Sequence, residues 1–265
     1  MRSIFTLQVL IFCLAATSCS AQTGPVENAA PLKITLLATH PHDARSFTQG
    51  LVYENGELYE SSGKYGESSL RRVEITTGKV LQKIALNQKY FAEGIAIVGD
   101  KIFQLTWREN ACFLYEKETF AWQKSFPYKG EGWGITWDGE KLIVSDGSDM
   151  LKFYDPETFQ LQRTLLVKNG QKSVDLINEL EYINGEIWAN ILYSNSIARI
   201  SPQNGQILGW IDMSNFVPKE IKNLQDRERA LNGIAFDEEK QRVYITGKYW
   251  PVLYEFQIIP NATKQ

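Results

Sequence analysis

The sequence predicts an all-β protein: a five-bladed β-propeller with four-stranded blades, whose ring is closed by an N-terminal strand. A short motif recurs five times at intervals of 44, 40, 46 and 53 residues, close to the length of a propeller blade. A turn signal follows each motif after a few residues. The chain has 265 residues, 43% of them apolar, which is enough for one well-buried domain of this kind.

The five motifs are expected to begin the innermost strand of each blade. They are Phe47-Thr48-Gln49-Gly50, Phe91-Ala92-Glu93-Gly94, Glu131-Gly132-Trp133-Gly134, Asn178-Glu179-Leu180-Glu181 and Leu231-Asn232-Gly233. The turn pairs that follow them are Asn55-Gly56, Gly99-Asp100, Asp138-Gly139, Asn184-Gly185 and Asp237-Glu238. Each turn separates β-rich runs, which is typical of hairpins. We therefore expect the first two strands of every blade to pair as a hairpin.

The outer strands are indicated by a second turn signal in the first four units. This signal lies at Thr77-Gly78, Glu118-Thr119, Glu157-Thr158 and Asn204-Gly205, between segments of alternating polarity. The fifth unit ends near Gln257 after only three strands. The alternating segment from Leu32 to Leu37 precedes the first motif and can supply the missing outer strand. We predict that this segment closes the ring.

One propeller domain is predicted over residues 32–260, between a linker at residues 22–31 and a tail at residues 261–265. The polar stretch from Glu220 to Ala230 has no glycine or proline, and we predict that it forms a surface helix before the last blade. No apolar run after the leader approaches the ~20 residues that a membrane span needs. We therefore expect no transmembrane span, and we expect a monomer.

Residues 1–21 have the pattern of a secretory signal peptide. Arg2 is the only charge among the first 26 residues, and an apolar stretch runs from Ile4 to Ala16. Cleavage can follow Ala21, or it can precede Cys19 with a lipid attached to that cysteine, because residues 16–19 resemble a bacterial lipobox. Either route predicts export to the periplasm or the exterior, and the second leaves a lipoprotein anchored to the membrane.

The composition excludes several classes of function. Charged residues make up 22% of the chain and the net charge is −3, so no basic field is available for nucleic acid. Three cysteines and two histidines leave little material for a zinc site, a disulfide framework or a Ser-His-Asp relay. The chemistry must depend mainly on carboxylates, amides, lysine and tryptophan, and we expect no metal or other cofactor.

The topology of a propeller locates the candidate site. The loops that enter the first strand of each blade and the loops that join its second and third strands open on the same face. The five motifs should therefore surround one mouth of the central channel, where a rigid scaffold holds binding residues. Glu93 should lie there beside aromatic walls, with its pKa raised by desolvation toward the range useful for proton transfer. The alternative is a carboxylate that bonds neighbouring backbone N–H groups.

Amide side chains and a lysine are further candidates at this mouth. Gln49, Asn178 and Asn232 occupy equivalent positions in three of the motifs. They either supply oriented hydrogen bonds to a ligand or fix their own loops. Lys248 follows Gly247 in a loop on the same face, where it is either a binding residue or the solvated end of a strand.

The aromatic and histidine candidates also have two interpretations. Trp107, Trp133 and Trp188 form an aromatic pocket or pack in the blade cores. His40 and His42 have a faint metal-ligand pattern, but their position before the first motif favours a surface loop.

Six motifs in order resemble the plant and bacterial type of glutaminyl-peptide cyclotransferase, over about residues 33 to 258. They are Phe47-Thr48-Gln49-Gly50-Leu51, Phe91-Ala92-Glu93-Gly94-Ile95, Gly132-Trp133-Gly134-Ile135, Asn178-Glu179-Leu180-Glu181-Tyr182, Leu231-Asn232-Gly233-Ile234-Ala235 and Thr246-Gly247-Lys248. The resemblance implies a five-bladed propeller enzyme that acts on peptides and proteins with N-terminal glutamine. Such an enzyme forms pyroglutamate and releases ammonia without a catalytic metal.

The resemblance also implies roles for individual residues. By its place in the motif, Glu93 corresponds to the general acid and base. The implied substrate-binding residues are Phe47, Gln49, Phe91, Trp107, Trp133, Asn178, Trp188 and Lys248.

Two other classes of function stay open at this point. In the first, a metal-dependent propeller lactonase or hydrolase, Glu93, Asn178, Asn232 and Asp146 would bind a calcium-like ion through oxygen atoms. In the second, a non-catalytic propeller would bind a peptide or partner on its aromatic face.

Overall fold

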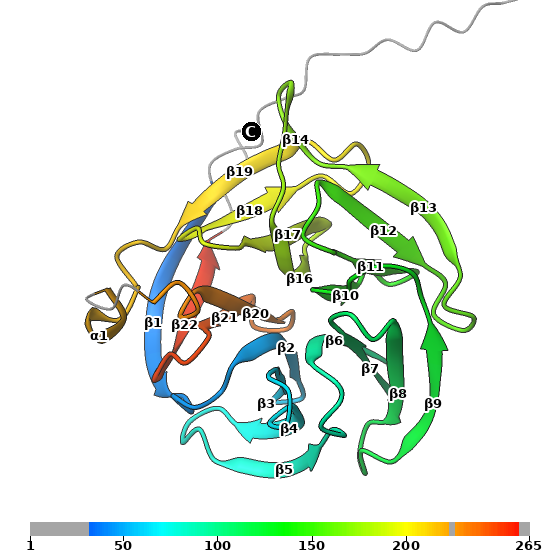
Figure 1. The fold of residues 1–265 in the computed structure, drawn as a ribbon. Helices are drawn as coiled ribbons and strands as arrows, with labels where there is room; N and C mark the ends of the chain where they lie inside the picture. The colour runs from blue at the N-terminus through cyan, green and yellow to red at the C-terminus, as the bar shows by residue number, and fades with distance from the viewer. Residues whose placement is uncertain (1–31, 223–225, 260–265) are drawn as a thin grey trace, which may run out of the picture.

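The fold is a ring of five antiparallel four-stranded sheets around one axis (Figure 1). The computed structural model describes residues 32–222 and 226–259. The predicted signal peptide, linker and tail lie outside the described residues, as does Cys19. No helix in the two described ranges is long and apolar enough to cross a membrane. The predicted five-bladed propeller is confirmed.

Each blade runs outward from the axis in the order of its strands. Blade 1 contains β2 (Thr48–Glu54), β3 (Glu57–Ser62), β4 (Ser69–Glu74) and β5 (Val80–Ala85). Blade 2 contains β6 (Ala92–Val98), β7 (Lys101–Thr106), β8 (Ala111–Glu116) and β9 (Trp122–Pro127). Blade 3 contains β10 (Ile135–Trp137), β11 (Leu142–Val144), β12 (Met150–Tyr154) and β13 (Leu161–Leu166). Blade 4 contains β16 (Ile177–Ile183), β17 (Glu186–Ile191), β18 (Ser196–Ile200) and β19 (Ile207–Asp212).

Blade 5 closes the ring with strands from both ends of the described chain. It contains β20 (Leu231–Asp237), β21 (Arg242–Gly247), β22 (Val252–Ile259) and, as the outer strand, β1 (Lys33–Pro41). Figure 1 shows the blue β1 beside the red β22, and the two pair antiparallel along their whole length. The predicted closing strand is therefore confirmed, although it is three residues longer than the alternating segment indicated.

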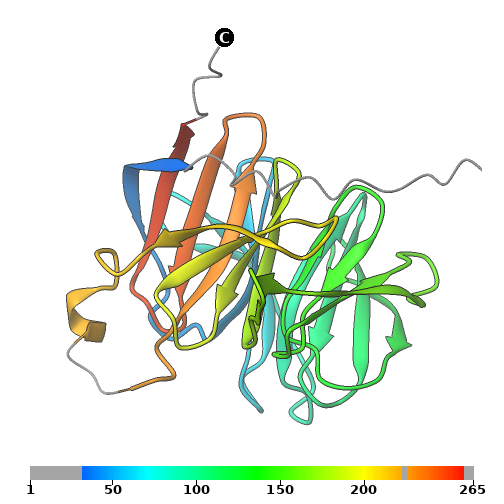
Figure 2. The same ribbon diagram turned by 90° about the horizontal axis from the view of Figure 1, so that it is seen from above.

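Two smaller elements lie outside the blades. A short hairpin of β14 (Lys168–Asn169) and β15 (Lys172–Ser173) connects blades 3 and 4, and α1 (Lys219–Lys222) lies at the rim of the ring (Figure 2). The predicted helix from Glu220 to Ala230 is therefore wrong in extent. Residues 226–230 form a turn, in which the carbonyl groups of Arg229 and Ala230 accept hydrogen bonds from Trp250 and Lys248. These tertiary contacts override the helical propensity of the segment.

The innermost strands approach so closely that their motifs require glycine. A Cβ atom placed on Gly50 of blade 1 would lie 2.5 Å from the backbone nitrogen of Ile95 in blade 2. One placed on Gly94 would lie 2.7 Å from the backbone nitrogen of Ile135 in blade 3, and Gly134 meets blade 4 even more closely. The glycines that the motifs share are therefore a packing requirement of the axis.

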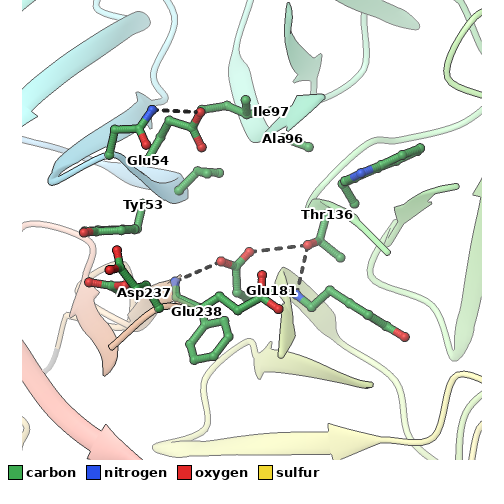
Figure 3. Close-up of a pocket in the computed structure, with 14 residues that line it drawn as sticks. Tyr53, Glu54, Ala96, Ile97, Thr136, Glu181, Asp237 and Glu238 are labelled. Atoms are coloured by element: carbon green, nitrogen blue, oxygen red, sulfur yellow. Dashed lines mark hydrogen bonds between the residues drawn. The ribbon is translucent and has the colours of Figure 1, made fainter. Parts of the chain in front are cut away.

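Two buried carboxyl groups of β16 join blade 4 to three other blades. Glu179 accepts hydrogen bonds from the backbone N–H groups of Leu51 in blade 1 (3.2 Å) and Ile234 in blade 5 (3.0 Å). Glu181 accepts from the backbone N–H of Phe236 in blade 5 (2.9 Å) and from Thr136 Oγ1 in blade 3 (3.3 Å), as Figure 3 shows. Burial raises the pKa of Glu181 to about 8 and that of Glu179 well above its ordinary value. Glu181 therefore keeps its proton near pH 7, and burial favours the neutral form of Glu179.

A buried ion pair fastens the closing strand to blade 1. His42 follows β1, and its Nδ1 donates to the carbonyl oxygen of Trp250 (2.7 Å) while Nε2 contacts Glu60 Oε1 (3.1 Å). Glu60 also accepts from Ser46 Oγ and Thr48 Oγ1. The surface-loop interpretation of His42 is wrong, because its side chain is only 6% exposed. The residues that bury it are distant in the sequence.

The charges of this pair support each other. Burial acts against a charged imidazole, but Glu60 and the Trp250 carbonyl outweigh it and raise the pKa of His42. Burial likewise acts to raise the pKa of Glu60, yet His42 and Arg71 lower it to about 2. Glu60 is therefore an anion at neutral pH, and it favours the charged form of His42.

We expect Glu181→Gln to remove a pH-dependent loss of stability. Folded Glu181 keeps its proton to about pH 8, whereas an unfolded glutamate releases it near pH 4.5, so the unfolding free energy falls as the pH rises between these values. At pH 9 the variant should melt about 4 °C or more above the parent protein, a gain of about 1–2 kcal/mol for this size, with little difference at pH 4.5. Thermal unfolding across this pH range measures the effect. A melting difference that does not change with pH would contradict it.

We expect His42→Gln to destabilise the ring most strongly below neutral pH. The stabilisation from the charged imidazole is fully present below its ordinary pKa of 6.5 and is lost as the pH rises through its raised value. At pH 6 the variant should lose about 3 kcal/mol of unfolding free energy, because removing one partner of a buried pair leaves the other uncompensated. Urea unfolding at pH 6 and pH 9 measures the loss. His40→Gln, which removes the contact between His40 Nε2 and Glu255 Oε2 at 2.8 Å, is the control. An equal loss for His42→Gln at both pH values would refute the charged pair.

Candidate active site

One mouth of the central channel holds a cavity of about 480 Å³. It is bounded by loops that enter first strands and by loops that join second and third strands. The lining residues are Phe47, Gln49, Lys64, Tyr65, Glu67, Phe91, Glu93, Trp107, Trp133, Asn178, Leu192, Tyr193, Arg227, Glu228 and Lys248. The structure therefore brings together eight of the nine residues that the sequence singled out, and Trp188 is the exception.

Irregular pairing at the start of the inner strands aims the polar side chains into this cavity. The β2–β3 ladder shifts register between Thr48 and Gly50, and the β6–β7 ladder shifts between Ala92 and Ile95. The β16–β17 ladder has the same irregularity after Ile177. Such bulges leave residues outside the ladder and redirect their side chains. Gln49, Glu93 and Asn178 occupy these bulges, which explains why equivalent motif positions meet at one mouth.

Glu93 is a buried carboxyl group with an unusual pKa. Its side chain accepts a hydrogen bond from Gln49 Nε2 (3.0 Å), and the residue is only 4% exposed. Burial raises its pKa well above the ordinary value, Lys248 opposes this, and the carboxylates of Glu131 and Glu109 add to it. Among the described residues, no backbone N–H donates to this carboxyl group, so the alternative interpretation of Glu93 does not apply.

Lys248 is a buried amine in the same cavity. The residue is 5% exposed, and burial lowers its pKa to about 8 although Glu93 acts to raise it. Its Nζ lies 4.8 Å from the centroid of the Phe47 ring. The backbone of its loop is fixed on both sides, because Lys248 N donates to Ala230 O and Tyr249 N donates to Ser46 O. Lys248 is therefore held near Glu93 rather than in solvent.

The aromatic walls rest on glycines of neighbouring loops. Phe91 contacts Phe47 edge-on, with centroids 6.0 Å apart, and Trp107 at 5.5 Å. A Cβ on Gly63 would lie 2.5 Å from the Phe91 ring, and one on Gly147 would lie 2.6 Å from the Trp133 ring. These glycines, at the junction of second and third strands, give the rings the space they occupy.

Trp188 does not reach the cavity, which corrects its assignment as a substrate-binding residue. It lies within β17 and packs in the core between blades 4 and 5, with 1% of its surface exposed. The same blade instead contributes Leu192 and Tyr193 from the loop after β17. The topological rule for these loops indicates both positions. It likewise indicates Lys64, Tyr65 and Glu67 after β3, which the sequence motifs did not single out.

The fold and the cavity define a class: five-bladed propellers with an open cavity of aromatic and polar side chains at one mouth of the channel. The family model for glutamine cyclotransferase matches residues 7–258. A curated glutaminyl-peptide cyclotransferase of Arabidopsis thaliana is 42% identical over 234 residues, which cover 88% of this chain and 73% of that protein. The crystal structure of Myxococcus xanthus glutaminyl cyclase matches with a TM-score of 0.79 and 35% identity, over 86% of this chain and 98% of that one. The chain belongs to the glutamine cyclotransferase family.

Proposed function

We propose that this protein converts the N-terminal glutamine of peptides and proteins into pyroglutamate and releases ammonia. The observation that carries the proposal is the buried carboxyl group of Glu93, which shares one cavity with Asn178 and Lys248. In this reaction the α-amine of the substrate attacks the side-chain amide carbon of the same residue. The nucleophile is therefore already tethered, and no serine or cysteine of the enzyme is needed.

One carboxyl group suffices for the proton transfers. Glu93 accepts a proton from the α-ammonium of the substrate, and the free amine attacks the amide carbon. Glu93 delivers this proton to the amide nitrogen, which leaves as ammonia when the carbon–nitrogen bond breaks, and the regenerated Glu93 carboxylate accepts the second proton that the ring nitrogen loses. The α-ammonium has an ordinary pKa of about 7.7–8.0, and the raised pKa of Glu93 reduces the mismatch between donor and acceptor. Such catalysis contributes roughly 10² to 10⁴ in rate.

The other polar groups orient the reacting amide. Gln49 donates to Glu93 and fixes the direction of its carboxyl group. Asn178 and Lys248, which line the same cavity, bind the γ-amide oxygen in this proposal, where negative charge develops as the ring closes. The walls formed by Phe91 and the tryptophans pack the aliphatic part of glutamine and exclude water.

The open mouth suits a substrate that enters by its first residue only. The remainder of the peptide extends outward past the rim, so the proposed substrates include folded proteins with an exposed N-terminus. We further propose that the protein acts after export directed by residues 1–21, either free or anchored through Cys19.

The metal-dependent alternative finds no support in the placement of its four residues. Glu93 and Asn178 line the cavity, but Asp146 pairs with Lys152 Nζ at 2.7 Å instead. Asn232 donates from its amide nitrogen to the carbonyl oxygen of Thr48 (2.9 Å). Asp146 and Asn232 therefore do not line the cavity beside Glu93 and Asn178.

We expect Glu93→Gln to lower kcat for a glutamine-initiated dipeptide by about 10²-fold or more, because the amide cannot relay the proton. Ammonia release and the corresponding mass loss of the peptide measure the reaction, and circular dichroism checks the fold. Glu140→Gln is the matched control, since the Glu140 side chain is 83% exposed in a hairpin turn. Near-normal turnover by Glu93→Gln would refute the mechanism, and absence of turnover by the parent protein would refute the function.

We expect kcat/KM to depend on pH with two limbs. Glu93 must be ionised to accept a proton, so activity should fall as the pH drops through its raised pKa, well above the ordinary 4.5. Activity should also fall above about pH 8, where Lys248 loses its charge. Initial rates from pH 5 to 9 measure the profile, and a separate titration of the substrate amine identifies its own contribution. An acidic limb near pH 4.5 would contradict the assignment of Glu93.

A further inference from the structure

One carboxylate outside the cavity lining joins two of its aromatic walls. Trp107 Nε1 donates to Glu131 Oε2 at 2.8 Å, and Trp133 Nε1 donates to the same oxygen at 3.0 Å. Trp107 follows β7 of blade 2, whereas Trp133 precedes β10 of blade 3. A single oxygen atom therefore fixes two indole rings from different blades relative to each other.

The second oxygen of Glu131 is held from the solvent side. Arg108 Nε donates to Oε1 at 2.9 Å, and the Arg108 guanidinium lies 3.7 Å from the centroid of the Trp107 ring. Burial acts to raise the pKa of Glu131, but the hydrogen bonds from Trp133, Arg108 and Trp107 hold it below its ordinary value. Glu131 is thus an anion. Its Oε2 atom accepts from the two indoles of the pocket walls, and its Oε1 atom accepts from Arg108.

These bonds determine what the two indoles present to a ligand. An indole has a single N–H donor, and in both rings Glu131 takes it. Trp107 and Trp133 therefore offer the cavity only apolar surface, which suits the methylene groups of a glutamine side chain. If Glu131 were absent, both donors would be free to bond water inside the cavity.

We propose that Glu131 is a positioning residue that holds Trp107 and Trp133 in the arrangement that receives the substrate glutamine. This inference rests on the proposed function of the same cavity. Glu131 does not line the cavity, so it acts through the two indoles and through its charge. Its negative charge also acts to raise the pKa of Glu93, as the charge of Glu109 does, whereas Lys248 acts to lower it.

Two substitutions distinguish the positioning of the two indoles from the effect of the Glu131 charge. Glu131→Leu removes the acceptor, and we expect KM for a glutamine-initiated dipeptide to rise about tenfold or more, as expected for the loss of charge-assisted hydrogen bonds. Glu131→Gln keeps an acceptor oxygen but loses the charge. For this variant we expect KM within about threefold of the parent value, with the acidic limb of the kcat/KM profile moved to lower pH.

Glu140→Leu and Glu140→Gln carry the same changes at an exposed site and should leave both readouts unchanged. Suppose that the parent protein converts the dipeptide. The positioning role is then wrong if Glu131→Leu keeps the parent KM, and it is also wrong if Glu131→Gln keeps the parent pH profile. If Glu131→Leu does not fold, the pH profile of Glu131→Gln decides alone. If the parent protein itself shows no turnover of glutamine-initiated dipeptides, the proposed function fails instead, and the two failures are distinguished.

Discussion

The close approach of the innermost strands at the axis is the constraint on which the rest of the structure depends. Backbone meets backbone between blades 1, 2, 3 and 4, so only glycine fits at Gly50, Gly94 and Gly134. Where blade 4 reaches the axis, Glu179 and Glu181 accept hydrogen bonds from backbone N–H groups of blades 1 and 5. Because Gln49, Glu93 and Trp133 each directly precede one of these glycines, the tight axis also constrains the geometry of this part of the cavity.

The buried carboxyl groups of Glu179, Glu60 and Glu93 have different hydrogen-bond and charge partners, and the pKa is lowered for Glu60 but raised for the other two. Glu179 accepts two backbone N–H bonds and is a structural acid. Glu60 faces His42 and Arg71 and is an anion that stabilises ring closure. Glu93 accepts one bond from Gln49 and lines the cavity, as the proposed proton transfer requires. The number and charge of the neighbours, more than burial itself, distinguish Glu93 from Glu60 and Glu179.

The sequence predicted the blades, the closing strand and most of the site because these depend on local patterns. Turn pairs and alternating strands define each blade, and the repeated motifs place Gln49, Glu93 and Asn178 at one mouth. Trp188 was misassigned because it lies within β17 and packs in the core between blades 4 and 5, which the resemblance to the family motifs does not show. The environment of His42 depends on Glu60 and on Trp250, 208 residues away, and no local pattern records such a contact. The predicted leader and anchor lie outside the described residues and stay predictions.

Blade 5 combines β1 with the last three strands of the described chain, and this constrains the order in which the ring can fold. β1 pairs with β22, and His40 contacts Glu255 across 215 residues of sequence. During synthesis the first strand of the ring emerges long before β22 exists, so it cannot pair with β22 until almost the whole chain is available. Contacts of such sequence separation form slowly because the intervening chain must first lose conformational freedom. The strand that completes the circle is thus the first to be made and among the last to find its place.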